Sequence, residues 1–160
     1  MVRQRKVGAV LEMYYEILNT IGHGSMGTVS RVQHLATGNQ YAMKAIQLSR
    51  ISAKMVQEMR NEIGILKRLD HPNIIRAIET FESKRRVFLI MKLCTGGDLT
   101  KRAPYTENVA VSLITKILSA VSYMHSRSIC HRDLKLENVM FESTDPDSEI
   151  QIIDFGLSKV

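Results

Sequence analysis

The residues with the clearest chemical potential lie in the segment HRDLKLENVM, at positions 131–140. Asp133 and Asn138 stand five residues apart there, with Lys135 between them. A carboxylate can accept or orient a hydroxyl proton, an ammonium can offset charge that develops on a phosphate, and an amide oxygen can bind magnesium. Asp154, in the segment IDFG, offers a further oxygen ligand for a hard cation. These residue types predict metal-assisted chemistry on a phosphate.

A second group of residues could hold phosphate oxygens. The segment GHGSMGTV covers residues 22–29, and its three glycines would let backbone amides approach an anion without obstruction by a Cβ atom. Taken alone, the pattern is explained equally well by a glycine-rich hairpin turn. It is not a dinucleotide-binding fingerprint, because the sequence predicts a strand after it, where that fingerprint requires a helix.

A lysine and a glutamate form a candidate ion pair. Lys44 shares one strand face with Ala42 and Ile46, because side chains on a strand alternate with a period of two. The alternative is a lysine that extends from an edge strand into solvent. Glu62 interrupts the apolar stripe of a predicted helix, and a carboxylate that faces a core needs a cationic partner. Lys44 is the natural candidate, and the pair would fix the ammonium for phosphate binding.

The first part of the chain must supply strands and one helix to position these groups. Alternating patterns predict strands at residues 14–22, 27–35 and 40–48. The period becomes helical from about Ser52, and this helix is expected to end near Asp70-His71-Pro72. Two more strands are expected, near residues 74–80 and 86–93, before a break at Gly96-Gly97.

A long helix is predicted in the second part, with Thr106 as its N-cap. Its apolar residues form one predicted stripe: Ala110, Leu113, Ile114, Ile117, Leu118, Val121 and Met124. Short strands and loops follow. The order of elements predicts an α+β fold, with a sheet-rich lobe that carries one helix and the beginning of a helical lobe.

Composition narrows the function classes. The 160 residues are 44% hydrophobic and 24% charged, as in an ordinary globular protein. The longest apolar run, residues 87–91, is too short to cross a bilayer. The net charge is +6, but the basic clusters at residues 3–6 and 84–86 have no aromatic or motif support for nucleic-acid binding, so we interpret them as a solvated end and a solvated turn. Cys94 and Cys130 are expected to be buried thiols in an intracellular, cytoplasmic protein.

All these constellations occur in one order, each in its required strand or loop context, and the chain therefore resembles the eukaryotic protein kinases over residues 15–160. Lys135, two residues after Asp133, is typical of Ser/Thr kinases. The segments EIGILKRLDHPNII, LCTGGDL, ILSAVSYMHS and IIDFGLSKV are most similar to calcium-dependent protein kinases of the calcium/calmodulin-regulated group. A calmodulin-like or other regulatory domain would lie outside this chain.

The resemblance implies ATP and Mg²⁺ as cofactors and assigns a role to each matching position. Asp133 would be the catalytic base, assisted by Lys135, and the pair of Lys44 and Glu62 would hold phosphates. Asn138 and Asp154 would bind the metal. The nucleotide would be bound by Ile21, Gly22, His23, Gly24, Ser25, Met26, Gly27, Thr28, Val29, Ala42, Lys44, Met91, Lys92, Cys94, Asp98 and Met140.

The resemblance also divides the chain into an N-terminal extension (1–13), a kinase N-lobe with hinge (14–95) and a partial C-lobe (96–160). Three departures stand out: Leu136 replaces the usual proline, Lys92 replaces an acidic hinge residue, and the segment between Gly97 and Thr106 is short, which shortens or deletes a small helix. No activation segment follows residues 154–156, so we expect a truncated or partial kinase domain that alone transfers phosphate slowly or not at all.

Two function classes remain open at this point. The first is an ATP-dependent Ser/Thr protein kinase acting on protein substrates. The second is a non-catalytic nucleotide-binding or interaction module derived from a kinase by truncation.

Overall fold

The computed structural model describes residues 3–5, 11–24, 27–50, 52–155 and 158. The chain forms two compact units. Unit 1 comprises Met1–Met59 and Ala77–Leu93, and unit 2 comprises Arg60–Arg76 and Cys94–Val160. The helix α1 (Ala53–Leu66) contributes its first half to unit 1 and its second half to unit 2.

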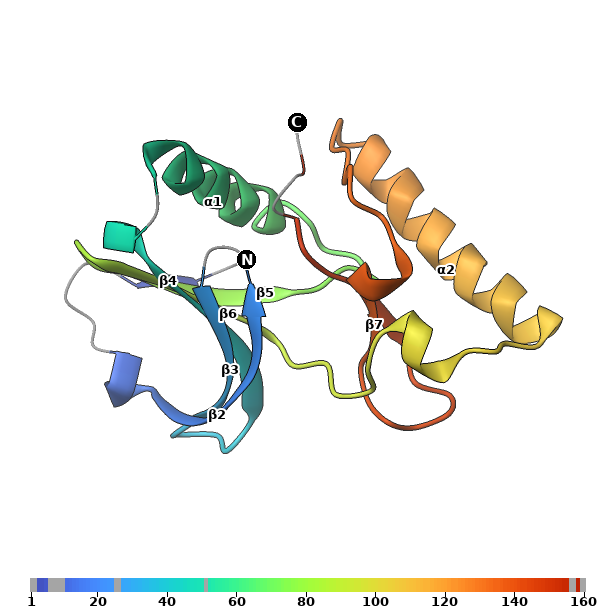
Figure 1. Ribbon diagram of the computed structural model, residues 1–160, viewed down its shortest axis with the longest axis horizontal. Helices are drawn as coiled ribbons and strands as arrows, with labels where there is room; N and C mark the ends of the chain where they lie inside the picture. The colour runs from blue at the N-terminus through green and yellow to red at the C-terminus, as the bar shows by residue number, and fades with distance from the viewer. Residues whose placement is uncertain (1–2, 6–10, 25–26, 51, 156–157, 159–160) are drawn as a thin grey trace. The chain divides into compact units, whose positions relative to one another are not determined.

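Unit 1 is built on one sheet with the strand order β1-β5-β6-β4-β3-β2 (Figure 1). All neighbours are antiparallel except β1 and β5. The predicted strands are confirmed to within a few residues at each end. The strands are β1 (Arg3–Arg5), β2 (Tyr15–Gly24), β3 (Gly27–His34), β4 (Gln40–Gln47), β5 (Ala77–Glu82) and β6 (Arg86–Lys92).

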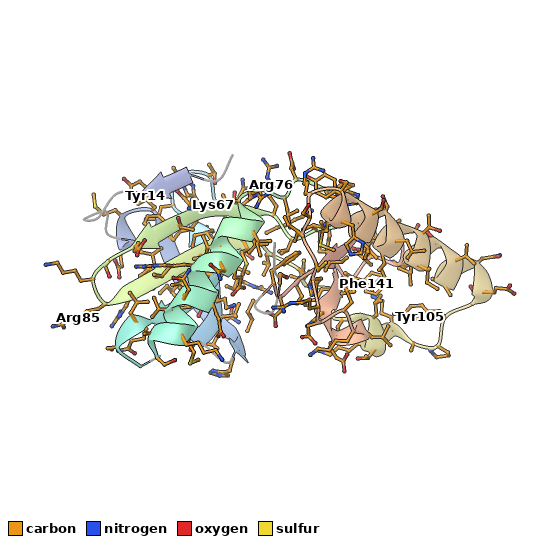
Figure 2. All side chains as sticks on the ribbon, turned by 90° about the horizontal axis from the view of Figure 1, so that it is seen from above. Tyr14, Lys67, Arg76, Arg85, Tyr105 and Phe141 are labelled. Atoms are coloured by element: carbon orange, nitrogen blue, oxygen red, sulfur yellow. The ribbon has the colours of Figure 1, made fainter. Side chains whose placement is uncertain are left out.

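The strand β1 lies within the N-terminal basic cluster, which we interpreted as a solvated end. The backbone of Arg3–Arg5 pairs in parallel with β5, with Arg3 opposite Glu79 and Arg5 opposite Phe81. An edge strand presents unpaired amides and carbonyls that any extended segment can join, whatever its side chains. Sequence periodicity therefore gave no sign of this strand. The other basic cluster is an exposed turn, as predicted, and Arg85 extends from it in Figure 2.

A buried cluster of unit 1 lies on one face of the sheet. Tyr15 packs edge-on against Tyr41 and Phe81, with ring centroids 6.0 and 6.1 Å apart. Its hydroxyl donates to the buried Glu79 carboxylate, Oη to Oε1 being 2.5 Å. This face also carries the short helix η1 (Leu11–Met13), while η2 (Leu48–Arg50) follows β4. The buried cluster is Leu11, Tyr15, Val32, Met43, Phe81 and Ile90.

Unit 2 is organised around α2 (Glu107–His125), which packs against β8 (Ile150–Ile152). The predicted N-cap is confirmed, because the Thr106 side chain accepts from the amide of Val109. The short segment before α2 holds only a four-residue 3₁₀ helix, η3 (Leu99–Arg102), in agreement with the shortened helix expected there. A further 3₁₀ helix, η4 (Leu136–Asn138), leads into β7 (Val139–Phe141), which pairs with β8.

The single apolar stripe predicted for α2 is wrong in its extent. Leu113 and Met124 are buried, together with Ala120, which was not assigned to the stripe. Ile114 is 55% exposed and Leu118 is 59% exposed. The packing of α2 against β8 covers a narrower strip of the helix than the predicted stripe. The apolar residues of α2 therefore fall on a buried side and on an exposed side.

The segment before β5 is fastened to the rest of unit 2. The amide of Asp70 donates to the Tyr123 hydroxyl at 2.8 Å, and His71 lies against the same ring. The Asn73 side chain donates to the carbonyl of Ile150 at 3.0 Å, and the Ile75 amide donates to the carbonyl of Ile152 at 2.9 Å. Residues 70–76 thus run alongside α2 and β8.

Both cysteines are free thiols, but they are not both buried as expected. Cys94 is half-buried and Cys130 is exposed. Cys130 directly precedes the HRD segment in a loop, and loop side chains have no fixed periodicity from which exposure could be read. Among the described residues, no helix combines the length and apolarity needed to cross a membrane.

Candidate active site

Unit 2 gathers two other predicted residues around the Asp133 carboxylate. Lys135 Nζ lies 3.1 Å from Asp133 Oδ2, and Asn138 Nδ2 lies 2.9 Å from the same oxygen. The Asn138 amide also donates to the Asp133 carbonyl at 2.8 Å. The hydrogen bond from Lys135 is the main reason that the pKa of Asp133 is lowered, and the same bond raises the pKa of Lys135. At neutral pH the site therefore contains a carboxylate and an ammonium.

His131 connects this loop to the strand that leads to Asp154. The ring is buried; its Nε2 lies 3.0 Å from the Ile153 carbonyl, and its Nδ1 accepts from the Asp133 amide at 3.3 Å. The two bonds together require a neutral imidazole with its proton on Nε2. Burial also lowers the pKa of His131, which favours the neutral form. The buried Phe155 ring packs edge-on against the imidazole, with centroids 4.7 Å apart.

The two predicted metal ligands are brought together by the backbone. The amide of Ile153, the residue before Asp154, donates to the Asn138 carbonyl at 2.9 Å. The Asp154 side chain is exposed, and its φ of 60° is left-handed, as is the φ of 65° at Arg132. Such backbone conformations are rare outside glycine and concentrate at functional sites.

The donor set fits a magnesium ion. Because the Asn138 nitrogen is committed to Asp133, the amide oxygen is left to act as a ligand. Within the described residues, no three His, Cys, Asp or Glu side chains cluster closely enough to hold a metal. Mg²⁺ commonly takes one or two protein oxygens and completes its octahedron with waters and substrate phosphates. A site with Asn138 and Asp154 alone is of that kind.

Unit 1 carries four of the predicted nucleotide-binding side chains on one sheet face, opposite to the Tyr15 cluster. Val29 is paired with Lys44, and Ala42 is paired with Met91, so these side chains share a face. Lys44 is half-buried and Ala42 is buried. The structure thereby confirms the strand face expected for Lys44, Ala42 and Ile46, and Lys44 lies on a central strand, which removes the edge-strand alternative.

The glycine segment forms the ends of β2 and β3. Gly22 pairs with Val29, and His23 pairs with Thr28. Ile21 and His23 are exposed, and Thr28 is half-buried. Gly24 and Gly27 are paired by their backbones, while Ser25 and Met26 lie outside the described residues.

The remaining predicted residues are distributed over both units. Glu62 is buried at 4% exposure in the second half of α1, where the sequence places it among apolar residues. Lys92 ends β6. Cys94 opens the later part of unit 2, in which Asp98 forms an antiparallel bridge with Met140. The pairing of Glu62 with Lys44 stays a prediction.

Two residues near the site were missed by the sequence reading. Ser158 is buried, and its hydroxyl donates to the His131 carbonyl at 3.2 Å. The Arg102 guanidinium donates to the Gly96 carbonyl and to the Ser143 carbonyl in the loop after β7. A lone serine and a lone arginine carry no motif, so no sequence signal could have identified them.

Comparison with known proteins identifies the family of this chain. The family model of the protein kinase domain matches residues 15–160. The chain is 40% identical to a probable myosin light chain kinase of Dictyostelium discoideum, over 98% of this chain and 41% of that protein. It is 39% identical to calcium-dependent protein kinase 3 of Plasmodium yoelii yoelii, over 92% of this chain and 28% of that protein. It is 38% identical to human calcium/calmodulin-dependent protein kinase type IV, over 94% of this chain and 32% of that protein.

The chain therefore belongs to the protein kinase domain family, and the kinase-like α+β fold predicted from the sequence is confirmed. Its relatives include calcium-dependent and calcium/calmodulin-dependent kinases, which confirms the predicted group. The chain spans well under two thirds of the length of these relatives, for example 41% of the Dictyostelium protein and 28% of the Plasmodium one.

Proposed function

We propose that the protein transfers the γ-phosphoryl group of Mg-ATP to a serine or threonine hydroxyl of a protein substrate. The observation that carries the proposal is the hydrogen-bonded cluster of Asp133, Lys135 and Asn138, linked through Ile153 to Asp154. In this proposal the cluster would supply a proton acceptor, a cation and two metal-binding oxygens from one loop system. Those are the groups that phosphoryl transfer uses.

In this proposal Asp133 orients the attacking hydroxyl and receives its proton. Its lowered pKa keeps it ionised at neutral pH, and makes it a weak base toward a hydroxyl until the bond to phosphorus is forming. That timing suits a loose transition state, in which the nucleophile needs positioning more than early deprotonation. The adjacent Lys135 ammonium offsets the negative charge on the transferring group.

The metal site is assigned to Asn138 and Asp154. When bound there, Mg²⁺ would neutralise charge on the phosphate oxygens. The arrangement around Asn138 supports this role, because its nitrogen faces Asp133 and leaves its oxygen as the ligand. Asp154 is exposed and can offer its carboxylate to the ion.

Nucleotide binding is assigned to the residues that the kinase pattern matches. The face with Val29, Ala42 and Met91 is apolar enough for an adenine ring, and Lys44 lies next to Val29 on it, where an ammonium would reach phosphates. We assign Glu62 as the partner that holds Lys44. In unit 2, the bridged pair of Asp98 and Met140 would contact the ribose and the base.

The relatives also suggest proposals on regulation and cellular location. Calcium-dependent and calcium/calmodulin-dependent relatives suggest regulation through a calmodulin-like domain or partner. An ATP-dependent reaction on protein substrates also suits a cytoplasmic location.

The test is a transfer assay with radiolabelled ATP and a basic serine peptide, run on the native protein and, in parallel, on the 160-residue chain, for which we expect slow transfer or none. Asp133→Asn keeps the side-chain size but removes the proton acceptor, so turnover should fall by roughly 10²–10⁴-fold. Lys44→Met should weaken ATP binding. If the folded protein binds ATP but its turnover equals that of Asp133→Asn, a nucleotide-binding module replaces the kinase assignment. If it shows no saturable ATP binding, the proposal is wrong.

A further inference from the structure

Residues 95–98 run antiparallel to residues 140–142 and form a small ladder in unit 2. The Gly96 amide donates to the Phe141 carbonyl at 3.0 Å, and the Phe141 amide donates to the Gly97 carbonyl at 2.8 Å. Asp98 and Met140 form the next bridge of the same ladder. The ladder therefore fixes the register of the two residues that we assign to the nucleoside.

Arg102 covers this ladder with its guanidinium group. The group stacks on the Phe141 ring, 3.8 Å from the ring centroid. Its Nε donates to the Gly96 carbonyl at 3.3 Å and its Nη1 to the Asp145 carbonyl at 2.9 Å, while its Nη2 donates to the Ser143 carbonyl. One side chain thus joins the first strand of the ladder to the loop that follows the second.

The fit around Arg102 is close. A Cβ atom on residue 96 would lie 2.0 Å from the Ser143 carbonyl oxygen and 2.6 Å from Arg102 Nη2, so only glycine leaves room for the guanidinium. Phe141 is labelled in Figure 2, as is Tyr105, whose hydroxyl donates to the Leu99 carbonyl at 2.5 Å. Three carbonyls and one aromatic face suit the planar five-donor guanidinium and not a lysine ammonium.

The helix η3 links Arg102 to Asp98. Asp98 caps the first turn by accepting from the Thr100 amide at 3.0 Å, and Arg102 is the last residue of the same element. Lys101, between them, lies 3.7 Å from Asp98 Oδ2. The same short helix therefore fixes both the orientation of the Asp98 carboxylate and the position of the Arg102 side chain.

We propose that Arg102 is a positioning residue for the nucleotide, which holds Asp98 and Met140 in the register that receives the nucleoside. The inference rests on the proposed function. Arg102 itself touches no reacting atom. Its loss should therefore weaken ATP binding while leaving the chemical step and the peptide site unchanged.

The experiment compares Arg102→Met and Arg102→Lys with the unsubstituted protein. Methionine can still cover the Phe141 ring but donates no hydrogen bond. Lysine keeps the positive charge but lacks the planar arrangement of donors that the guanidinium provides. The matched control is Arg127→Met, because Arg127 stacks on the Tyr123 ring at the same 3.8 Å distance, outside the ladder. ATP affinity is measured by calorimetry with Mg²⁺ present, and KM and kcat are measured for ATP and peptide. Melting temperature is recorded without nucleotide.

We expect both Arg102 variants to raise the Kd and the KM for ATP on the order of tenfold, with kcat and peptide KM within about twofold of the unsubstituted protein and no rescue by lysine. Arg127→Met should leave all of these values unchanged. An unchanged ATP affinity in the Arg102 variants, with only a lower melting temperature, would overturn the inference. An ATP affinity in Arg102→Lys equal to that of the unsubstituted protein would also overturn the inference. If Arg102→Met does not fold, the ATP affinity of Arg102→Lys is the test. Absence of ATP binding by the unsubstituted protein would instead refute the proposed function.

Discussion

At the scale of single residues, hydrogen-bond direction decides what each side chain of the site can still do. Asn138 donates both of its described side-chain bonds to Asp133, which leaves an oxygen for a cation. His131 accepts from a backbone amide and so must carry its proton on the other nitrogen. In both cases the assignment comes from the partner and not from the residue type.

We predict that Asn138→Ala affects stability and metal dependence together. The change removes two bonds to Asp133 from a buried side chain, so the free energy of unfolding should fall by about 1–3 kcal/mol. Loss of the amide oxygen should also raise the Mg²⁺ concentration required for half-maximal transfer. The control is Asn19→Ala, since Asn19 is exposed and makes one long bond of 3.4 Å. A normal magnesium requirement in folded Asn138→Ala would contradict the assignment of this ligand.

Stability should decrease in mildly acidic solution because of His131. Its pKa in the folded state is below the ordinary 6.5, so the unfolded chain binds a proton at pH values where the folded chain does not. The contribution of His131 to the free energy of unfolding is complete above the pKa that it has in the unfolded chain. This contribution is lost as the pH falls from about 6.5 toward the lower pKa of the folded state. His71, whose pKa burial also lowers, contributes in the same direction.

The measurement is urea unfolding between pH 7.5 and 5.5 for the unsubstituted protein and for His131→Gln. Glutamine can still donate to the Ile153 carbonyl but does not titrate, so the pH dependence of the unfolding free energy should be shallower in this variant. His71→Gln serves as the parallel variant that separates the two histidines. Identical slopes for the unsubstituted protein and His131→Gln would show that His131 does not contribute.

At the scale of elements, two glycines of the glycine segment are glycine for different physical reasons. At Gly27 a Cβ atom would lie 1.9 Å from the Ala45 carbonyl oxygen, across the β3–β4 pairing. At Gly22 the nearest atom to an added Cβ is 4.0 Å away, which is ordinary contact. Gly27 is therefore needed by the sheet itself. Nothing in the described part of the protein requires a glycine at position 22, so under the proposed function Gly22 leaves space for the ligand.

We expect Gly27→Ala to destabilise the nucleotide-free protein by roughly 1–3 kcal/mol, the usual cost of overpacking. Gly22→Ala should change the stability by less than about 0.5 kcal/mol, as a substitution without strain does. It should nevertheless weaken ATP binding, because the methyl group occupies space in front of the amides. Thermal unfolding and calorimetric titration of both variants make the comparison. Equal loss of stability in the two variants would refute the distinction.

At the scale of the whole molecule, α2 exposes an apolar strip formed by Val111, Ile114 and Leu118, each more than half exposed. Contiguous exposed apolar surface favours association. The net charge of +6 opposes it through repulsion between molecules. The apolar strip is confined to one helix face, whereas the charge is spread over the chain. At moderate salt, screening shortens the range of the repulsion between molecules to about 8–10 Å, so association through the strip should outweigh this repulsion.

The double substitution Ile114→Glu with Leu118→Lys should therefore reduce self-association of the 160-residue chain. The new residues are spaced for a favourable i, i+4 pair and keep the net charge unchanged. The melting temperature should stay within a few degrees, because neither side chain is buried. Sedimentation velocity at several protein concentrations measures the association. Leu113→Ala, on the buried side of α2, is the contrasting variant and should cost about 2–5 kcal/mol. Unchanged association in the double variant would rule out the strip as its cause.

The sequence by itself determined the elements and the identity of the chemical groups. Strand periodicity located β2, β3, β4 and β6, and capping located the start of α2, because both are local properties of a few consecutive residues. The spacing of Asp133, Lys135 and Asn138 likewise predicted one cluster, since a short loop keeps its own residues close.

Only the tertiary structure decided which side of α2 is covered, that residues 3–5 join the sheet, and that Arg102 reaches the carbonyls of Ser143 and Asp145. The last contact joins positions more than 40 residues apart in the sequence. Each of these features depends on where a distant part of the chain returns. Local patterns report what a segment can form, whereas packing against remote partners determines which of its groups are buried, paired or left for a ligand.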